Sequence, residues 1–192
     1  MTIPDPVRRH AETRPDARAL VSDVGDWTWR GLDARVSATA RVLEAGPERV
    51  AVQAVTSPSL VVLVLAALRA RRLLVPLSTR WIPADTARTL TDLEVDSLIV
   101  DAPSDLEVEM SVLEDVIASG ERGDALPLDL DRPFTVVHTS GSTGRPKAIL
   151  HSVGNHVWSA RGVIDAFEVR PSSRWLLDLP LYHVGGLGIV MR

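Results

Sequence analysis

The feature that most constrains the fold is an alternation of short apolar stretches with longer segments of helical periodicity. Between Gly31 and Ala45 apolar residues recur every three or four positions, and a Val-rich stretch, 49–55, follows Gly46 and Pro47. Strands separated by helices of ten or more residues are typical of βαβ units, whose strands run parallel. The sequence therefore predicts an α/β fold with a largely parallel sheet flanked by helices.

The other expected elements follow from the same patterns. Ser57 and Pro58 are typical of a helix start, and the helix they begin extends to about Arg71. Its run 60–68 is apolar nearly all round and is expected to be buried. Further helices are expected at 5–13, 83–93, 112–118 and 155–167, with another starting at 185–188. Further strands are expected at 19–22, 27–29, 73–77, 97–100, 134–138, 148–151 and 175–179. The tryptophans stand at scattered spacings and are expected in the core: Trp27, Trp29, Trp81, Trp158 and Trp175.

The composition excludes several classes of protein. The chain has 192 residues, a formal net charge of −4 and no cysteine, which excludes a disulfide scaffold, an iron–sulfur cluster and a thiolate nucleophile. A mild acidic excess argues against nucleic acid as a partner, because nucleic acid requires a basic face. The run 60–68 is much shorter than the roughly 20 residues of a membrane span, and the N-terminal segment lacks the apolar region of a signal peptide. We therefore expect a cytoplasmic protein with no membrane span. The oligomeric state stays open, a homo-oligomer included.

The segment with the most chemical information is a run of small polar residues after the expected strand at 134–138. It reads Thr139, Ser140, Gly141, Ser142, Thr143 and Gly144, followed by Arg145, Pro146 and Lys147. Backbone N–H groups and hydroxyls in such a loop can surround an anionic oxygen, and glycines let the backbone approach a ligand closely. The pattern is neither a Walker A loop nor G-x-G-x-x-G. We interpret it as a phosphate-binding loop, the alternative being a plain Ser/Gly turn between two strands.

Lys147 strengthens that interpretation. It is the single lysine among 21 basic residues. A compact ammonium on a flexible stem suits a crowded phosphate site better than a planar guanidinium does. The alternative is compositional drift that left one lysine in an arginine-rich chain.

The segment Thr139–Lys147 resembles the phosphate-binding signature of the adenylate-forming superfamily, which includes acyl-CoA synthetases, luciferases and peptide-synthetase adenylation domains. Segments 154–156, 159–160, 174–176 and 179–187 resemble the o-succinylbenzoate–CoA ligases of menaquinone biosynthesis within it, and 60–80 resembles its first conserved helix and strand. Ala148 departs from the glycine usual after Pro-Lys. Members of the superfamily are more than twice as long. We therefore expect residues 1–192 to be a partial N-terminal adenylation domain, without the rest of that domain and the small C-terminal domain.

The resemblance implies ATP-dependent activation of an aryl carboxylic acid, o-succinylbenzoate, to an acyl-adenylate and then to an acyl-CoA. ATP, Mg²⁺ and CoA would be co-substrates. Residues Thr139 to Gly144 with Lys147 would hold the β- and γ-phosphates. His183 would line the acid site together with Gly185 and Gly186, and Lys147 and His183 would be the catalytic residues. Arg192 would bind the second carboxylate of the acid, since arginine pairs with carboxylates through two parallel hydrogen bonds.

Each assignment has an alternative. His183 could be a structural histidine at a strand end, and Arg192 one exposed arginine among twenty. Asn155 and His156 are assigned to packing on the substrate side, and His151 to a structural role. The alternative functions are another acyl- or aryl-CoA synthetase, or a non-catalytic phosphate-binding truncated domain. The 192 residues alone are expected to be inactive.

Overall fold

The computed structural model describes residues 1–106, 108–139 and 146–192. Its helices are α1 (Pro6–Thr13), α2 (Trp29–Glu44), α3 (Pro58–Arg69), α4 (Pro83–Asp92), α5 (Leu113–Val116), α6 (Val153–Ala166) and α7 (Val184–Val190). Its strands are β1 (Thr2–Ile3), β2 (Arg18–Ser22), β3 (Gly25–Thr28), β4 (Arg49–Gln53), β5 (Leu73–Pro76), β6 (Ser97–Val100), β7 (Glu109–Val112), β8 (Leu128–Asp129), β9 (Pro133–Thr139) and β10 (Lys147–Ser152).

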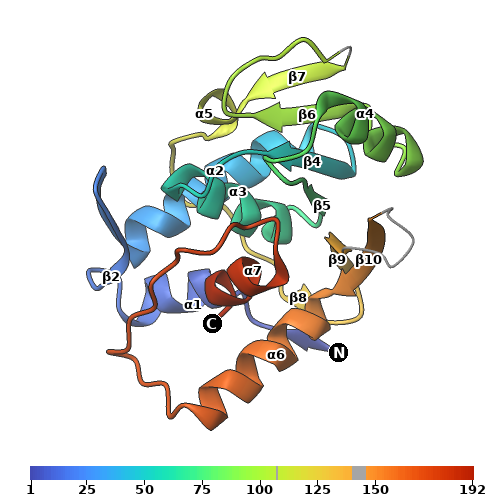
Figure 1. The fold of residues 1–192 in the computed structure, drawn as a ribbon. Helices are drawn as coiled ribbons and strands as arrows, with labels where there is room; N and C mark the ends of the chain where they lie inside the picture. Colours follow the sequence, from blue (N-terminus) through green and yellow to red (C-terminus); the bar gives the residue numbers. More distant parts are fainter. Residues whose placement is uncertain (107, 140–145) are drawn as a thin grey trace.

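One sheet organises the molecule. Its strand order is β10-β9-β5-β4-β6-β7, with β10 antiparallel to β9 and all other neighbours parallel (Figure 1). The pairs β1–β8 and β2–β3 form two small antiparallel sheets. The predicted α/β class with a largely parallel sheet is confirmed.

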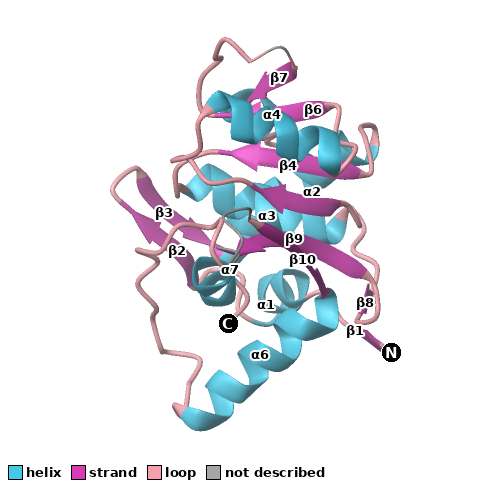
Figure 2. Cartoon of the chain, turned by 45° about the vertical axis from the view of Figure 1, so that its right-hand side comes forward, coloured by secondary structure: helices cyan, strands magenta, loops and turns pink. Residues whose placement is uncertain are grey.

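Successive residues of the strands enter two different hydrophobic clusters, because side chains alternate between the faces of a sheet. Val50 and Val52 of β4 join the main cluster, which contains α2 and α3, whereas Ala51 between them joins the second cluster with Leu90 of α4. β5 divides in the same way at Leu74 and Val75. Figure 2 shows α4 on one face of the sheet and α2 and α3 on the other. Both faces are therefore covered, as a parallel sheet requires.

Helix α3 confirms the predicted buried helix. The Ser57 hydroxyl accepts a hydrogen bond from the Leu60 amide at 3.2 Å, and Pro58 occupies the first turn. All residues from Leu60 to Arg69 are buried, including one charged side chain. Among the described residues, no helix is long and apolar enough to cross a membrane.

Arg69 carries that buried charge, which is paired with two aspartates, the N-cap residue of α1 and one residue of α2. Its guanidinium donates to Asp5 at 2.9 and 3.1 Å and lies 2.8 Å from a carboxylate oxygen of Asp33, which is fully buried. Arg8 and Arg122 also pair with Asp33, at 3.0 and 2.7 Å. Burial lowers the pKa of Arg69, but hydrogen bonds and charges from Asp5 and Asp33 outweigh this and raise it. We refer to these five residues as the Asp33 ion cluster.

Several element predictions are wrong in detail. Trp29 begins α2 rather than ending a strand, because the Thr28 hydroxyl caps the helix by accepting from the Gly31 amide. The helix expected at 112–118 is shortened to Leu113–Val116, with β7 before it. The expected strand at 175–179 is absent: this stretch has no regular secondary structure and pairs with no strand of the sheet.

The expectation that all five tryptophans lie in the core is also wrong. Trp158 is 59% exposed and Trp175 is 40% exposed. Trp27 and Trp29 pack against the main cluster and Trp81 against the second.

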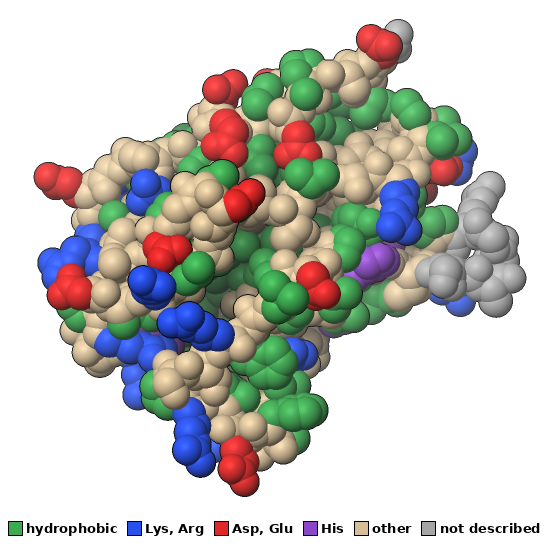
Figure 3. Space-filling model, turned by 60° about the vertical axis from the view of Figure 1, so that its left-hand side comes forward, with side chains coloured by type: hydrophobic (Ala, Val, Ile, Leu, Met, Phe, Trp, Pro, Cys, Tyr) green, Lys and Arg blue, Asp and Glu red, His purple; other side chains and the backbone are tan. Residues whose placement is uncertain are grey.

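On the face drawn in Figure 3, acidic and basic side chains are interspersed among hydrophobic ones.

Candidate functional site

The carboxyl ends of β4 and β5 form a topological switch point. After β4 the chain turns to α3, which packs in the main cluster, whereas after β5 it turns to α4, which packs in the second. Gln53, the last residue of β4, links this strand to the connection after β5 and to α4 by donating to the Ser78 carbonyl oxygen at 2.7 Å and the Thr86 hydroxyl at 3.1 Å. Open α/β sheets bind ligands outside such switch points. This edge of the sheet is the candidate site.

The predicted phosphate-binding loop leaves from the same edge. β9 runs parallel to β5 and ends at Thr139, and β10 begins at Lys147, which lies directly opposite Thr139 in the antiparallel register. Both residues are exposed. Ser140, Gly141, Ser142, Thr143 and Gly144 lie outside the described residues. The hairpin thus holds the one lysine of the chain beside the first residue of the loop.

His138 is a residue at this site that sequence analysis did not single out. Its ring lies edge-on to Trp81, with ring centres 5.0 Å apart, so it joins the connection after β5 to the end of β9. Burial lowers its pKa, and its Nδ1 is buried without a hydrogen-bond partner in the described part of the chain. Its position directly before Thr139, at the end of an apolar strand, was the available signal.

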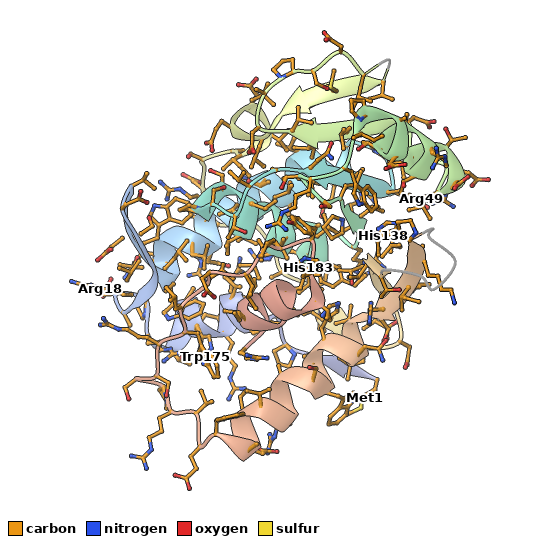
Figure 4. The ribbon with its side chains drawn as sticks, in the orientation of Figure 1. Met1, Arg18, Arg49, His138, Trp175 and His183 are labelled. Carbon is orange, nitrogen blue, oxygen red and sulfur yellow. The ribbon has the colours of Figure 1, made fainter. Side chains whose placement is uncertain are left out.

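The segment before α7 crosses the end of β4. The Thr56 hydroxyl, just after β4, donates to the Leu179 carbonyl oxygen at 3.4 Å, and Leu181 is buried in the main cluster. His183 caps α7 and is exposed, with its ring 4.6 Å from that of Tyr182. It therefore lies at a helix start, as expected, but no strand precedes it (Figure 4).

The glycines after His183 allow the backbone to pack closely on itself. A Cβ atom on Gly186 would collide with the carbonyl oxygens of Pro180 and Leu179, and one on Gly185 would lie 3.0 Å from a Leu179 methyl group. These positions hold α7 against the preceding turn. The structure therefore gives Gly186 a packing reason, independent of any substrate.

Arg192 follows α7 and is partly buried. Its guanidinium carbon lies 4.9 Å from the centre of the Trp175 ring, within cation–π range. Its Nε is buried without a hydrogen-bond partner among residues 1–106, 108–139 and 146–192. The alternative of an ordinary exposed arginine does not describe this side chain.

The Gly-Asn-His segment has structural contacts instead of a place at the sheet edge. A Cβ on Gly154 would lie 2.8 Å from the Leu130 carbonyl oxygen, and Asn155 forms a capping box with Ser152 at the start of α6. His156 is buried, with its Nε2 2.8 Å from the Thr135 hydroxyl. Burial, and secondarily the charge of His151, lower the His156 pKa to about 4. The assignment of Asn155 and His156 to substrate-side packing has no support from these contacts.

A hollow of about 140 Å³ lies away from this edge. Its lining includes Val42, Gly46, Val50 and Ser97, which stand at the amino ends of β4 and β6 or before them. It is therefore not part of the candidate site.

The fold is an α/β domain whose largely parallel sheet is covered on both faces, and the predicted loop joins β9 to β10 at the carboxyl edge of that sheet. The chain belongs to the AMP-binding enzyme family, whose model matches residues 7–191. It is 29% identical over 197 residues to the 2-succinylbenzoate–CoA ligase of Enterococcus faecalis, covering 97% of this chain and 41% of that protein. The chain therefore spans about two fifths of the length of that relative.

Solved structures share the fold. The o-succinylbenzoate CoA synthetase of Bacillus subtilis, in complex with its acyl-adenylate intermediate, matches 99% of this chain and 53% of that chain with a TM-score of 0.88 and 24% identity. The same enzyme with ATP and a magnesium ion matches 100% of this chain and 55% of that chain with a TM-score of 0.87 and 22% identity.

Proposed function

We propose that the protein containing this chain is an acid–CoA ligase that activates 2-succinylbenzoate (o-succinylbenzoate), a step of menaquinone biosynthesis. A carboxylate oxygen of the acid would attack the α-phosphorus of MgATP, the bond to the bridging oxygen would break, and pyrophosphate would leave. The CoA thiol would then attack the acyl carbon, lose its proton, and release AMP. The relatives named above, which are ligases and synthetases for this acid, support the proposal.

The observation that carries the proposal is the register of β9 and β10. Thr139 and Lys147 lie opposite each other at the carboxyl edge of the sheet, so the chain between them starts and ends beside the switch point. A cation held there can draw negative charge toward the leaving pyrophosphate. Positioning and electrostatic stabilisation are the main requirements of phosphoryl and nucleotidyl transfer. In this proposal Lys147 acts as that cation, and Thr139 to Gly144 donate to the β- and γ-phosphates.

The acid would bind along α7. His183 at the start of α7 would meet the carboxylate that is activated, with the backbone of Gly185 and Gly186 lining the acid site beside it, and Arg192 at the other end would pair with the second carboxylate. The seven-residue helix between them, which rises roughly 10 Å, separates the two residues. The Arg192 side chain shortens this separation by reaching back along the helix, as its position near Gly188 supports.

An AMP-release assay tests the proposal on the full-length protein, with MgATP, CoA and one carboxylic acid at a time. We expect 2-succinylbenzoate to give the highest kcat/KM of a panel that includes benzoate, 2-methylbenzoate and medium-chain fatty acids. Higher kcat/KM with one of the other acids would identify a different acyl- or aryl-CoA synthetase, and the substrate assignment would then be wrong.

For the 192-residue chain alone, we propose ATP binding without turnover, since it spans 41% of the length of the Enterococcus relative. Isothermal titration with MgATP, compared with a Lys147→Ala variant, measures this directly. A heat of MgATP binding that is present in the wild-type chain and lost in Lys147→Ala would support nucleotide binding by the loop. AMP formation by the chain alone would contradict the expected lack of turnover.

A further inference from the structure

Arg192 packs against a residue that the proposed chemistry does not use. The Trp175 ring lies 4.9 Å from its guanidinium carbon. A Cβ on Gly188 would lie 3.5 Å from Nη2 of Arg192, an ordinary van der Waals distance, so the end of the side chain lies beside Gly188. Trp175 comes from the segment between α6 and α7, and lies on the side of α7 away from His183 in Figure 4.

This geometry sends the Arg192 side chain back along α7. Side chains on a helix tilt toward its N-terminus, and residues four apart lie one above the other. Arg192 follows the C-cap of α7, and its Nη2 lies 3.5 Å from where a Cβ of Gly188 would be, so the guanidinium lies beside the last turn of α7. A planar guanidinium stacked on a ring keeps its edge free for a bidentate partner.

The absence of a carboxylate partner distinguishes Arg192 from the arginines of the Asp33 ion cluster. No ion pair involves Arg192 within the described ranges, whereas Arg69 contacts two aspartates. A partly buried guanidinium without an anion is costly unless something compensates it. A ring face compensates part of that cost while leaving the positive charge available to a ligand.

We propose that Trp175 is a positioning residue for Arg192: its ring orients the guanidinium toward the second carboxylate of a dicarboxylic acid. This inference rests on the proposed function and assigns its acid specificity. Trp175 touches no reacting atom. It sets how well the enzyme distinguishes a dicarboxylic acid from a monocarboxylic analogue of the same shape.

The test compares Trp175→Leu, Trp175→Phe and the matched control Trp158→Leu in the full-length protein. Trp158 is an exposed tryptophan of α6. KM and kcat are measured with 2-succinylbenzoate and with an analogue whose second carboxylate is a methyl group. Trp175→Leu should raise KM for 2-succinylbenzoate about 3- to 30-fold, the range of a cation–π contact. It should leave kcat for 2-succinylbenzoate and KM for the analogue within about twofold of the wild-type values, a difference of only some 0.4 kcal/mol.

Trp175→Phe retains a ring and should recover most of the affinity, and Trp158→Leu should match the wild type. A general packing defect would instead change both acids equally. Equal KM changes for the two acids, unchanged KM in Trp175→Leu, or a Trp175→Phe variant as weak as Trp175→Leu would each overturn the inference.

A second readout separates this inference from the proposed function. The NMR resonance of the Arg192 Nε–H group is assigned by its loss in Arg192→Lys. This resonance should shift in Trp175→Leu, because the ring current of the indole is lost. In the wild type it should also shift when 2-succinylbenzoate is added without ATP. If the wild-type enzyme activates no dicarboxylic acid, the proposed function fails. In that case the positioning role is still supported if the Arg192 Nε–H resonance shifts on titration with 2-succinylbenzoate, and it is contradicted if the resonance does not shift.

Discussion

Arg69 and Arg192 show two ways in which this fold uses a guanidinium. Arg69 lies between α1, α2 and α3, where Asp5, Asp33 and the Ser37 hydroxyl take up its donors. Arg192 lies against an aromatic ring, and its Nε has no partner among the described residues. The residue type is the same, but Arg69 is buried whereas Arg192 is only partly buried, and the partners differ. An arginine whose donors are taken by carboxylates serves folding, whereas one held by a ring stays available to an anion.

The same contrast extends to the surrounding regions. The α1–α3 side is joined by ion pairs across long sequence separations, and α3 is buried on every side. The region of β10, α6 and α7 has exposed apolar side chains, including Ile149, Leu150 and Trp158. We therefore expect substitutions in the first region to change stability, and substitutions at the sheet edge to change chemistry.

The largest effect should come from breaking the Asp33 ion cluster. Asp33→Asn keeps the volume but removes the charge that three arginines share, and one-sided loss of a buried ion pair costs about 3–5 kcal/mol. Urea unfolding followed by tryptophan fluorescence measures this. Asp16→Asn is the control, since Asp16 and Arg30 form an exposed pair at 3.2 Å, and such pairs contribute about 0–1 kcal/mol. Similar losses in both variants would contradict the structural role of the cluster.

His156 should make stability depend on pH. Its pKa falls from 6.5 to about 4 in the folded chain, so the unfolded chain binds more protons between these values. Stability is therefore retained above pH 6.5 and lost as the pH falls toward 4, by on the order of 3 kcal/mol.

His156→Gln serves as the reference for this titration. A neutral amide can still bond Thr135 and does not titrate. The difference in unfolding free energy between wild type and variant should shrink or reverse as the pH is lowered from 7 to 4. Parallel pH curves for the two proteins would show that His156 is not the titrating group, since His10 and His138 also have lowered pKa values.

Gly186→Ala should destabilise the site region moderately. The added methyl group meets the backbone oxygens of Pro180 and Leu179, and overpacking of this kind costs about 1–3 kcal/mol. Gly162→Ala is the matched control, because a Cβ there meets nothing within 4 Å and Gly162 lies inside α6. That control should gain about 0.5–1 kcal/mol from helix propensity. Chemical denaturation of both variants measures whether the free energy of unfolding falls in Gly186→Ala and rises in Gly162→Ala.

Lys147→Arg should have the smallest effect in free energy, and it should act on activity alone. Lys147 is exposed at the start of β10, so folding should be unchanged. A guanidinium presents its charge differently from a compact ammonium, and we expect about a tenfold loss in the rate of acyl-adenylate formation, or roughly 1.4 kcal/mol. Pyrophosphate release in single-turnover experiments reports this step. An unchanged rate in Lys147→Arg would contradict the idea that the compact ammonium group of Lys147 is required for this step.

Much of the fold could be predicted from local patterns. The helix starting at Ser57 and Pro58 and the strands β4, β5 and β6 follow from periodicity and capping, because these elements pack in regular layers. The stretch 175–179 could not be predicted correctly. It has the apolar composition of a strand but pairs with no strand of the sheet, and local composition does not decide whether a stretch pairs with a neighbour.

The candidate site divides in the same way. The small-residue run, the single lysine and the histidine before the glycines were visible in the sequence because unusual residue types stand at a strand end or helix start. His138 and the contact of Trp175 with Arg192 were not predicted, since the local sequence at either position does not identify the side chain that it contacts. Their roles depend on Trp81 and Arg192, which are distant in the sequence or on another element.

The sequence by itself determined the α/β class, the position of the glycine- and hydroxyl-rich loop, and the lysine that follows it, because these depend on periodicity and residue chemistry along a few turns of chain. Only the tertiary structure decided which arginines are paired, which histidines are buried and which tryptophan holds Arg192. Those properties depend on contacts between residues tens of positions apart, and their energies arise from shared burial, which no local pattern records.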